Sequence, residues 1–244
     1  MSPLPSDWRP WRASSQLEGR RPDRSELERV RHRGSGRDDV LPYPDDERCA
    51  GQVRLLIVGV NPSPWTAAVN APFARPGNRF WPSLHLAGVT ESAVDASTGL
   101  SRADERMLAE RGIGMTNLVS RPTARADELD DAELRRGGER TVGRVRTMLP
   151  RAVAVVGITA FRKAFSAPRA RVGEQDTSRI SGWPDGTALW ALPHPSGLNA
   201  HETVDSLAEH WRTVWDAANT GDESDQPYET NGQGCSALGE DEQG

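Results

Sequence analysis

Three polar side chains that could act on a substrate lie at or near the ends of apolar runs in the sequence. Asn61 directly follows the first run, Asn117 lies within the second, and His194 ends the last. A continuous apolar run bounded by a turn is typical of a strand that is buried on both faces. Because ligands of parallel sheets bind beyond the carboxyl ends of the strands, we expect these side chains to meet at one edge of a sheet.

The elements that must position these residues alternate between strand and helix. Apolar runs predict strands at 53–60, 112–119, 152–157 and 187–194, and helices are expected at 78–88, 130–149, 159–165 and 201–218. This alternation predicts an α/β fold of three layers, α/β/α, with a central, mainly parallel four-stranded sheet. Asn199 and Glu202 have the spacing of a capping box at the start of the last helix.

Composition divides the 244 residues into three parts. Residues 1–50 are rich in Pro, Arg, Asp and Gly, which predicts a basic, largely disordered N-terminal extension with at most one short helix, near 25–33. Residues 51–218 are long enough to bury one core. Residues 219–244 hold seven acidic residues and no basic one, which predicts a disordered acidic tail. This charge distribution is compatible with polyanion binding, and two solvated termini are the alternative.

The sequence argues against several classes of protein. No run approaches the roughly 18 apolar residues of a transmembrane helix, and the N-terminus lacks the apolar segment of a secretory signal. Cys49 and Cys235 are far apart and have no ligand-spaced partners, so neither a disulfide nor a metal is expected, and a reducing cytoplasm fits. A nucleotide-binding enzyme is disfavoured because the glycine patterns of dinucleotide and phosphate-binding loops are absent.

Three segments together resemble the mismatch-specific uracil/thymine DNA glycosylases, a family within the uracil-DNA glycosylase superfamily. They are GVNPSPWTAAVNAPFARPGNRFW, GMTNLVSRPTARADEL and LPHPSGLN, in matching order and spacing over about residues 53–216. The resemblance implies a uracil-DNA glycosylase-like catalytic domain over 51–218. It also implies removal of uracil from double-stranded DNA in base-excision repair, with G·U and G·T mismatches as candidate contexts. A cofactor-free, nucleoid-associated bacterial monomer is expected.

The resemblance assigns the catalytic roles to Asn61 and His194. Hydrolysis of an N-glycosidic bond leaves a cationic sugar and an anionic base, so it needs a placed water and donors for the base. Asn61 would position that water at the sugar C1′; the alternative is an Asx-turn asparagine. His194 would donate from a neutral imidazole to uracil O2; the alternative is a histidine satisfied by backbone. The mismatch-specific family often has asparagine at position 194, so this departure predicts broader activity on uracil.

Base binding is assigned by the same resemblance to Val60, Phe73 and Asn117. The ring of Phe73 would stack on the flipped base, and the backbone of Val60 would bond to the base edge. Asn117 could donate to uracil O4 and accept from its N3–H. A core aromatic beneath a loop is the alternative for Phe73, and Trp65 could either line the pocket mouth or contact DNA.

DNA contacts are expected from the loop Ser196, Gly197, Leu198 and Asn199. Reaching a base inside a duplex requires flipping it out of the stack, and Leu198 would fill the vacated space. Ser196 and the following helix N-terminus offer donors to a phosphate. An arginine that some relatives have just after this segment is replaced by Ala200, which predicts weaker recognition of an opposite guanine.

Two other functions remain open on the sequence. The serine in GVNPS stands where the family usually has a second glycine, which leaves room for a deaminated-purine glycosylase that removes hypoxanthine. A non-catalytic DNA-binding protein that scans for lesions is the alternative outside enzymes. Among glycosylases a monofunctional one is expected, because the sole lysine, Lys163, lies away from the motifs and could not form a Schiff base with the sugar.

Overall fold

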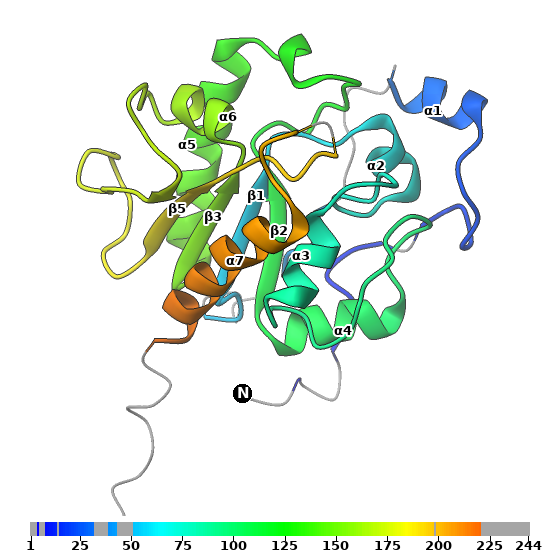
Figure 1. The fold of residues 1–244 in the computed structure, drawn as a ribbon, viewed down its shortest axis with the longest axis horizontal. Coiled ribbons are helices and arrows are strands. Elements are labelled where there is room, and N and C mark those ends of the chain that lie inside the picture. Colours follow the sequence, from blue (N-terminus) through cyan, green and yellow to red (C-terminus); the bar gives the residue numbers. More distant parts are fainter. Residues whose placement is uncertain are drawn as a thin grey trace, which may run out of the picture.

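The four apolar runs form the parallel part of the central sheet (Figure 1). The strands β2 (Ile113–Asn117), β1 (Leu55–Gly59), β3 (Ala152–Val156) and β5 (Ala188–Leu192) lie side by side in that order and are parallel. Every residue of β1 and β3 is buried, as expected for strands covered on both faces. The computed structural model that defines these elements describes residue 4 and residues 8–13, 15–31, 39–42, 51–197 and 199–220.

A fifth strand completes the sheet, so the prediction of four strands is wrong in number. β4 (Gly173–Glu174) pairs antiparallel with β5, with Gly173 opposite Ala191 and Glu174 opposite Trp190. Two residues are too few to form an apolar run, and this strand therefore leaves no signal in the hydrophobic pattern. The predicted α/β class and the mainly parallel sheet are confirmed.

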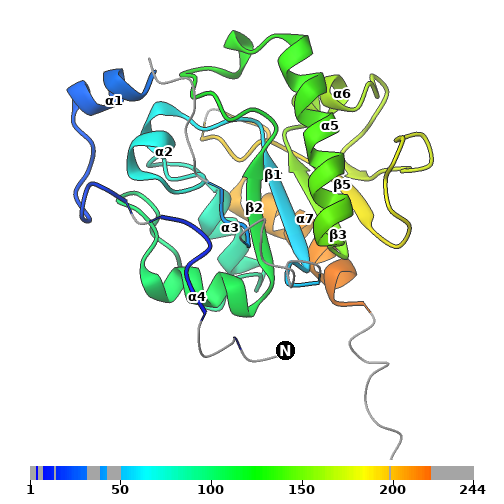
Figure 2. The same cartoon turned by 180° about the vertical axis from the view of Figure 1, so that it is seen from behind.

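Helices cover both faces of the sheet (Figures 1 and 2). On one face α3 (Phe80–Leu86) packs against α7 (Val204–Asn219), and α7 contacts β3 and β5; α5 (Asp131–Met148) and α6 (Ile158–Ala164) pack together on the other. Two helices were not predicted, α2 (Pro64–Val69) after β1 and α4 (Arg102–Glu110) against β2. A short 3-10 helix, η1 (Ala126–Glu128), precedes α5. Among the described residues, no helix is both long and apolar enough to cross a membrane.

The start of α7 differs from the predicted capping box. Thr203 is the N-cap, and its Oγ1 accepts a hydrogen bond from the N–H of Ser206 at 3.1 Å, while the Ser206 hydroxyl accepts one from the N–H of Thr203 at 2.9 Å. Asn199 instead donates through Nδ2 to the carbonyl of His194 at 3.0 Å. The asparagine is therefore engaged in the preceding loop and cannot cap the helix.

Several described residues of the N-terminal extension are ordered parts of the fold, contrary to the expectation for residues 1–50. Trp11 and Leu17 are buried, and Val40 pairs antiparallel with Met115 at the edge of β2. Arg24–Arg31 form α1, which lies against α2 (Figure 1). Single apolar residues spaced widely among Pro and Arg show no periodicity, so the sequence pattern does not reveal this packing. Of the predicted acidic tail, 219–244, Asn219 is the last residue of α7, and residues 221–244 lie outside the described residues.

Candidate active site

A pocket of about 360 Å³ opens at the carboxyl ends of β1, β2 and β5. Six residues that were predicted from the sequence line it, namely Val60, Asn61, Phe73, Asn117, His194 and Ser196. Five of them lie at or just after the ends of β1, β2 and β5, which are far apart in the chain, and Phe73 lies in the segment between α2 and α3. In the sheet β1 lies next to β2, and β3 separates β1 from β5. The strand order therefore brings these residues together at one edge, as parallel pairing predicts.

The side-chain amide of Asn61 is held by three acceptors. Nδ2 donates to Oγ1 of Thr123 at 2.8 Å, to the carbonyl of Arg121 at 3.0 Å and to the carbonyl of Pro62 at 3.2 Å. A carbonyl cannot donate, so exchanging the oxygen and nitrogen of this amide would set oxygen against oxygen. Oδ1 accepts no hydrogen bond from any described residue. It is thus the amide atom left to accept one from a water molecule in the pocket.

The imidazole of His194 has a defined neutral form. The backbone N–H of Ser196 donates to its Nδ1 at 3.2 Å, and a nitrogen that accepts a hydrogen bond carries no proton. The proton of the neutral ring therefore resides on Nε2. Although the residue is exposed at the pocket, the protein around the ring removes enough water to lower the pKa of His194. Both features favour a neutral ring that donates through Nε2–H.

Phe73 adopts a backbone conformation that bulky residues rarely take. Its φ angle is 53°, and such strain concentrates at functional sites. The ring stacks on Phe80 with centroids 3.7 Å apart and planes inclined by 15°. Phe80 is fully buried, so one side of the Phe73 ring is fixed by the core while the residue lines the pocket.

Gly59 gives Asn117 its place at the end of β2. A Cβ atom built on Gly59 would lie 2.4 Å from Oδ1 of Asn117 and 3.2 Å from Cζ of Phe73. Any side chain at position 59 would therefore displace both of these residues from the pocket.

Val60, the next residue, is buried, and its carbonyl accepts a hydrogen bond from the N–H of Val119 at 2.9 Å. Its carbonyl is accordingly already engaged within the protein.

The loop after β5 is held by Arg79, which precedes α3. Its guanidinium donates to the carbonyls of Asn199 at 2.8 Å, Gly197 at 3.2 Å and Glu202, and its backbone N–H donates to the carbonyl of Pro195 at 3.0 Å. One side chain thus satisfies three outward carbonyls of a loop that has no regular structure. Arg79 fixes the path of the loop that carries the predicted DNA contacts.

The residues that were predicted to contact DNA differ in how far their polar groups are already bonded within the protein. Gly197 is exposed, and a Cβ there would lie 2.9 Å from the carbonyl oxygen of Gly77, so glycine permits the two loops to approach. Asn199 donates through Nδ2 within the loop and accepts through Oδ1 from the N–H of His201 at 3.2 Å. Its backbone is engaged as well, since its N–H donates to the carbonyl of Ser196 at 2.9 Å and its carbonyl accepts from Arg79. Asn199 therefore braces the loop, and its contact to DNA stays a prediction. Leu198 lies outside the described residues.

Asp127 is the carboxylate that lines this pocket. It forms an ion pair with Arg125, and its side chain is 61% exposed. A solvated, paired carboxylate is a weak candidate for deprotonating a buried water. Among the described residues no cluster of three or more His, Cys, Asp or Glu side chains could hold a metal ion.

Sequence reasoning missed two residues that organise the site, Thr123 and Arg79. Thr123 is 4% exposed and bonds to Asn61; it lies in the segment SRPTARADEL, whose resemblance was recognised without a role for the threonine. Arg79 lies in the segment PGNRFW, and its partners follow it by more than a hundred residues. Neither contact has a local signature, because each depends on how two loops meet in space.

The site and the fold agree with a comparison to known families. Residues 46–218 match the model of the uracil DNA glycosylase superfamily. The match covers most of the chain, the whole sheet and every residue that lines the pocket. DNA glycosylases hydrolyse the bond between a base and its deoxyribose, which is the chemistry that a water-orienting amide and an imidazole donor can support. This chain therefore belongs to the uracil DNA glycosylase superfamily.

Proposed function

We propose that the protein is a monofunctional DNA glycosylase that removes uracil from DNA. The observation that carries the proposal is the amide of Asn61, whose nitrogen is held by three protein acceptors while its oxygen is left for water. That oxygen shares a pocket with the Nε2–H donor of His194 and the amide of Asn117. A water acceptor, a base donor and a base-reading amide are the three groups that the hydrolysis needs.

In the proposed reaction the flipped uracil lies against Phe73, and Asn117 bonds to its Watson–Crick edge. The bond between C1′ and N1 breaks, and its electron pair stays with the base. The negative charge that develops on O2 is stabilised by Nε2–H of His194. Water held by Oδ1 of Asn61 adds its oxygen to C1′ and releases a proton to solvent, and the uracil anion takes up a proton from solvent, so the products are an abasic sugar and free uracil.

We further propose that His194 broadens the substrate range beyond mismatches. A donor to O2 stabilises the leaving base whatever lies opposite it, whereas recognition of an opposite guanine depends on the loop after β5. Ala200 in that loop has no side-chain donor to offer a guanine. Uracil should therefore be removed from G·U and A·U pairs and from single strands, and thymine or hypoxanthine more slowly.

Single-turnover excision with chelator present tests the proposal. One oligonucleotide sequence would carry uracil opposite G, uracil opposite A, single-stranded uracil, thymine opposite G or hypoxanthine opposite T. Asn61→Ala should slow uracil excision at least about 100-fold, because the water loses its position, and should leave DNA affinity nearly intact. Asp127→Asn is the matched control in the same pocket and should keep most of the rate.

Three outcomes would contradict the proposal. Faster excision of hypoxanthine than of uracil would assign the pocket to deaminated purines. Full activity in the Asn61→Ala variant would remove the proposed mechanism. DNA binding without excision of any base would leave a non-catalytic protein that scans for lesions.

A further inference from the structure

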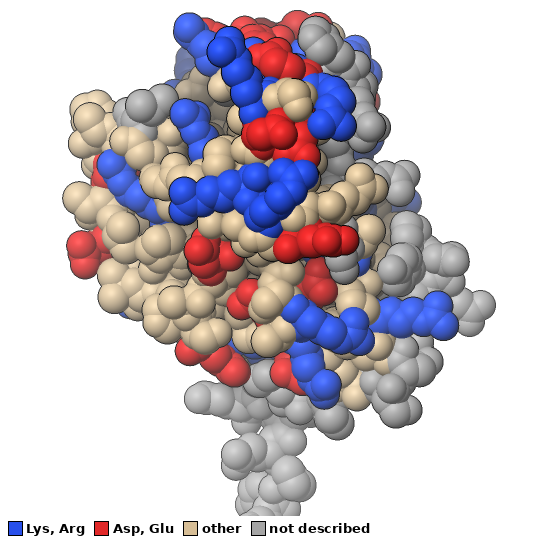
Figure 3. All heavy atoms as spheres, turned by 90° about the vertical axis from the view of Figure 1, so that its right-hand side faces the viewer, with Lys and Arg blue, Asp and Glu red and all other residues tan. Residues whose placement is uncertain are grey.

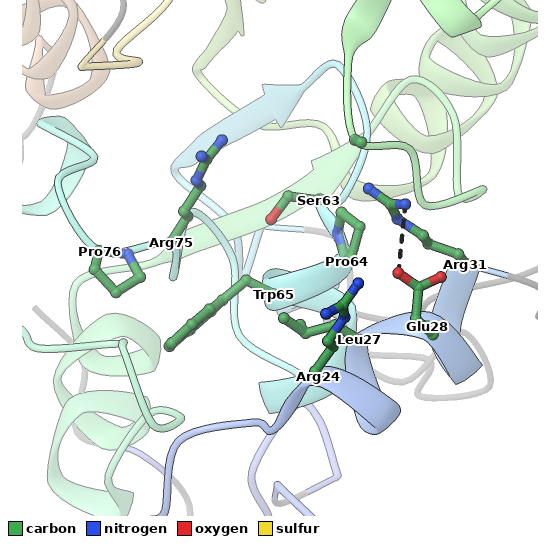
Figure 4. Close-up of a pocket in the computed structure, with 10 residues that line it drawn as sticks. Arg24, Leu27, Glu28, Arg31, Ser63, Pro64, Trp65, Arg75 and Pro76 are labelled. Carbon is green, nitrogen blue, oxygen red and sulfur yellow. Dashed lines mark ion pairs between the residues drawn. The ribbon is translucent and has the colours of Figure 1, made fainter.

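A second pocket of about 450 Å³ lies beside the candidate active site, between α1 and the start of α2 (Figure 4). Ser63, Arg75 and Ala124 line both pockets, so the two form one continuous groove. The far wall of the second pocket is α1, which lies outside the segment that matches the superfamily. The groove is thus an addition that this chain's N-terminal extension makes to the shared domain.

The charge of this groove is carried by three arginines, two of which have a guanidinium group without a partner among the described residues. Arg24, Arg31 and Arg75 line it together with a single carboxylate, Glu28. Glu28 pairs with Arg31 at 3.7 Å on the same helix. Arg24 and Arg75 are exposed, and the guanidinium group of neither has a hydrogen bond or an ion pair with any described residue. Two guanidinium groups on opposite walls are therefore available to an anion.

Trp65 supplies an aromatic surface between these arginines. In Figure 4 its side chain extends from α2 across the pocket, between Arg75 and the helix that carries Arg24. Its Nε1–H donates to the carbonyl of Ser97 at 2.9 Å, which fixes the ring. A fixed aromatic ring between cations suits a chain that alternates phosphates with flat bases and sugars.

Arg24 is the first residue of α1, and hydrogen bonds of neighbouring side chains stabilise the start of this helix. The N–H of Glu26 donates to Asp23 at 2.9 Å, and the N–H of Asp23 donates back to Glu26 at 2.9 Å. Arg20 also pairs with Glu26, which ties the preceding turn to the helix. Reciprocal bonds of this kind stabilise the first turn of a short helix. The position of Arg24 relative to the pocket is therefore set by structure.

Overall charge does not single out a surface on this face of the molecule. Figure 3 shows the side that carries α1 and α4, where bands of basic side chains alternate with acidic ones. A local site that combines unpaired arginines with continuity to the candidate active site is a more specific signal than net charge.

We propose that this groove holds the DNA strand on one side of the flipped nucleotide. Arg24 and Arg75 each neutralise a backbone phosphate, and Trp65 lies against the adjoining sugar or base. The inference rests on the proposed function, since the strand enters the groove because its neighbouring nucleotide occupies the active site. The N-terminal extension is accordingly part of the DNA-binding surface.

The test is the salt dependence of binding by the full chain to a duplex with a tetrahydrofuran abasic site, measured by fluorescence anisotropy. The slope of log affinity against log salt should fall by about 0.9 for Arg24→Gln and again for Arg75→Gln, since each variant loses one phosphate contact. When the salt is raised from about 50 to 200 mM, the loss of affinity should be roughly 3-fold smaller for each phosphate contact that a variant lacks. Glu28→Gln should change the affinity in the opposite direction and tighten DNA binding, because it releases Arg31 from its ion pair.

Arg29→Gln is the matched control, because Arg29 is exposed on the same helix and does not line the pocket. It should keep the wild-type slope. Equal losses in Arg29→Gln and Arg24→Gln would overturn the inference in favour of a diffuse charge effect. Unchanged or tighter DNA binding in the Arg24→Gln and Arg75→Gln variants would overturn it in favour of another occupant, such as an acidic peptide. Because binding is measured without excision, failure of the groove is distinguishable from failure of the glycosylase activity.

Discussion

Nδ2 of Asn61 lies 2.8 Å from Oγ1 of Thr123, and that hydroxyl donates its proton to the carbonyl of Arg125 at 2.7 Å. A threonine hydroxyl has a single proton, so one that donates to Arg125 can only accept from Asn61. The donor and acceptor roles in both hydrogen bonds are therefore fixed by the backbone carbonyl of Arg125, which can only accept. Thr123 keeps the nitrogen of the amide inward, and in the proposed mechanism it is the positioning residue that leaves the amide oxygen for water.

Replacing Thr123 by Val should slow uracil excision about 5- to 10-fold, the effect of losing one orienting hydrogen bond. Single-turnover rates and DNA affinity would be measured separately, and the affinity should stay unchanged because Thr123 is 4% exposed. Thr123→Ser keeps the hydroxyl and should restore most of the rate. A valine variant as fast as the wild type would contradict the prediction, because valine keeps the methyl group and lacks only the hydroxyl.

The convergence of Asn61, Asn117 and His194 was predictable because it follows from the sheet alone. Each residue is at or near the end of an apolar run, and parallel pairing aligns such ends regardless of the loops between them. Thr123 and Arg79 were not predictable, because their partners are set by loop paths that leave no periodic pattern. The same reason explains why the packing of Trp11 and the two-residue strand β4 escaped the sequence analysis.

The lowered pKa of His194 predicts a specific dependence of stability on pH. In the unfolded chain a histidine takes up its proton at about pH 6.5, whereas burial keeps the folded ring neutral to lower pH. The unfolded state therefore binds more protons just below about pH 6.5, and the free energy of unfolding should fall as the pH falls through that window. Above it both states are neutral, and His194 contributes no pH dependence.

Urea unfolding of the wild type and His194→Gln at about pH 7 and about pH 5 checks this sign. The wild type should lose more stability on acidification than the variant, because glutamine does not titrate. An NMR titration of the His194 ring should give a pKa below about 6.5. A pKa above that value would contradict both the neutral tautomer and its role as a donor from Nε2.

The carbonyl contacts of Arg79 predict a role in DNA engagement that its charge alone does not provide. Arg79→Gln and Arg79→Lys should both slow excision from duplex DNA, because neither side chain can reach the carbonyls of Gly197 and Asn199 together as the guanidinium does. Single-stranded uracil requires no flipping out of a duplex and should be affected less. Equal losses on the two substrates would mean that Arg79 supports the catalytic pocket and not the loop after β5.

Two glycines in α5 predict opposite effects of the same substitution. A Cβ on Gly143 would meet no atom within 4 Å, so Gly143→Ala should stabilise the protein by about 0.5–1 kcal/mol through the higher helix propensity of alanine. A Cβ on Gly137 would lie 2.3 Å from the carbonyl oxygen of Leu118, next to Asn117. Gly137→Ala should therefore destabilise by about 1–3 kcal/mol, the usual cost of overpacking.

Excision rates would show whether Gly137→Ala affects only the stability of the protein or also the candidate active site. Because Leu118 directly follows Asn117, the shift that relieves the clash at position 137 should displace the amide of Asn117, which we propose bonds to the base. We expect Gly137→Ala to slow excision even at temperatures where the variant is fully folded, with Gly143→Ala unchanged as the control in the same helix. Wild-type rates for folded Gly137→Ala would show that α5 yields to the extra methyl group, so that close packing at this glycine does not set the position of Asn117.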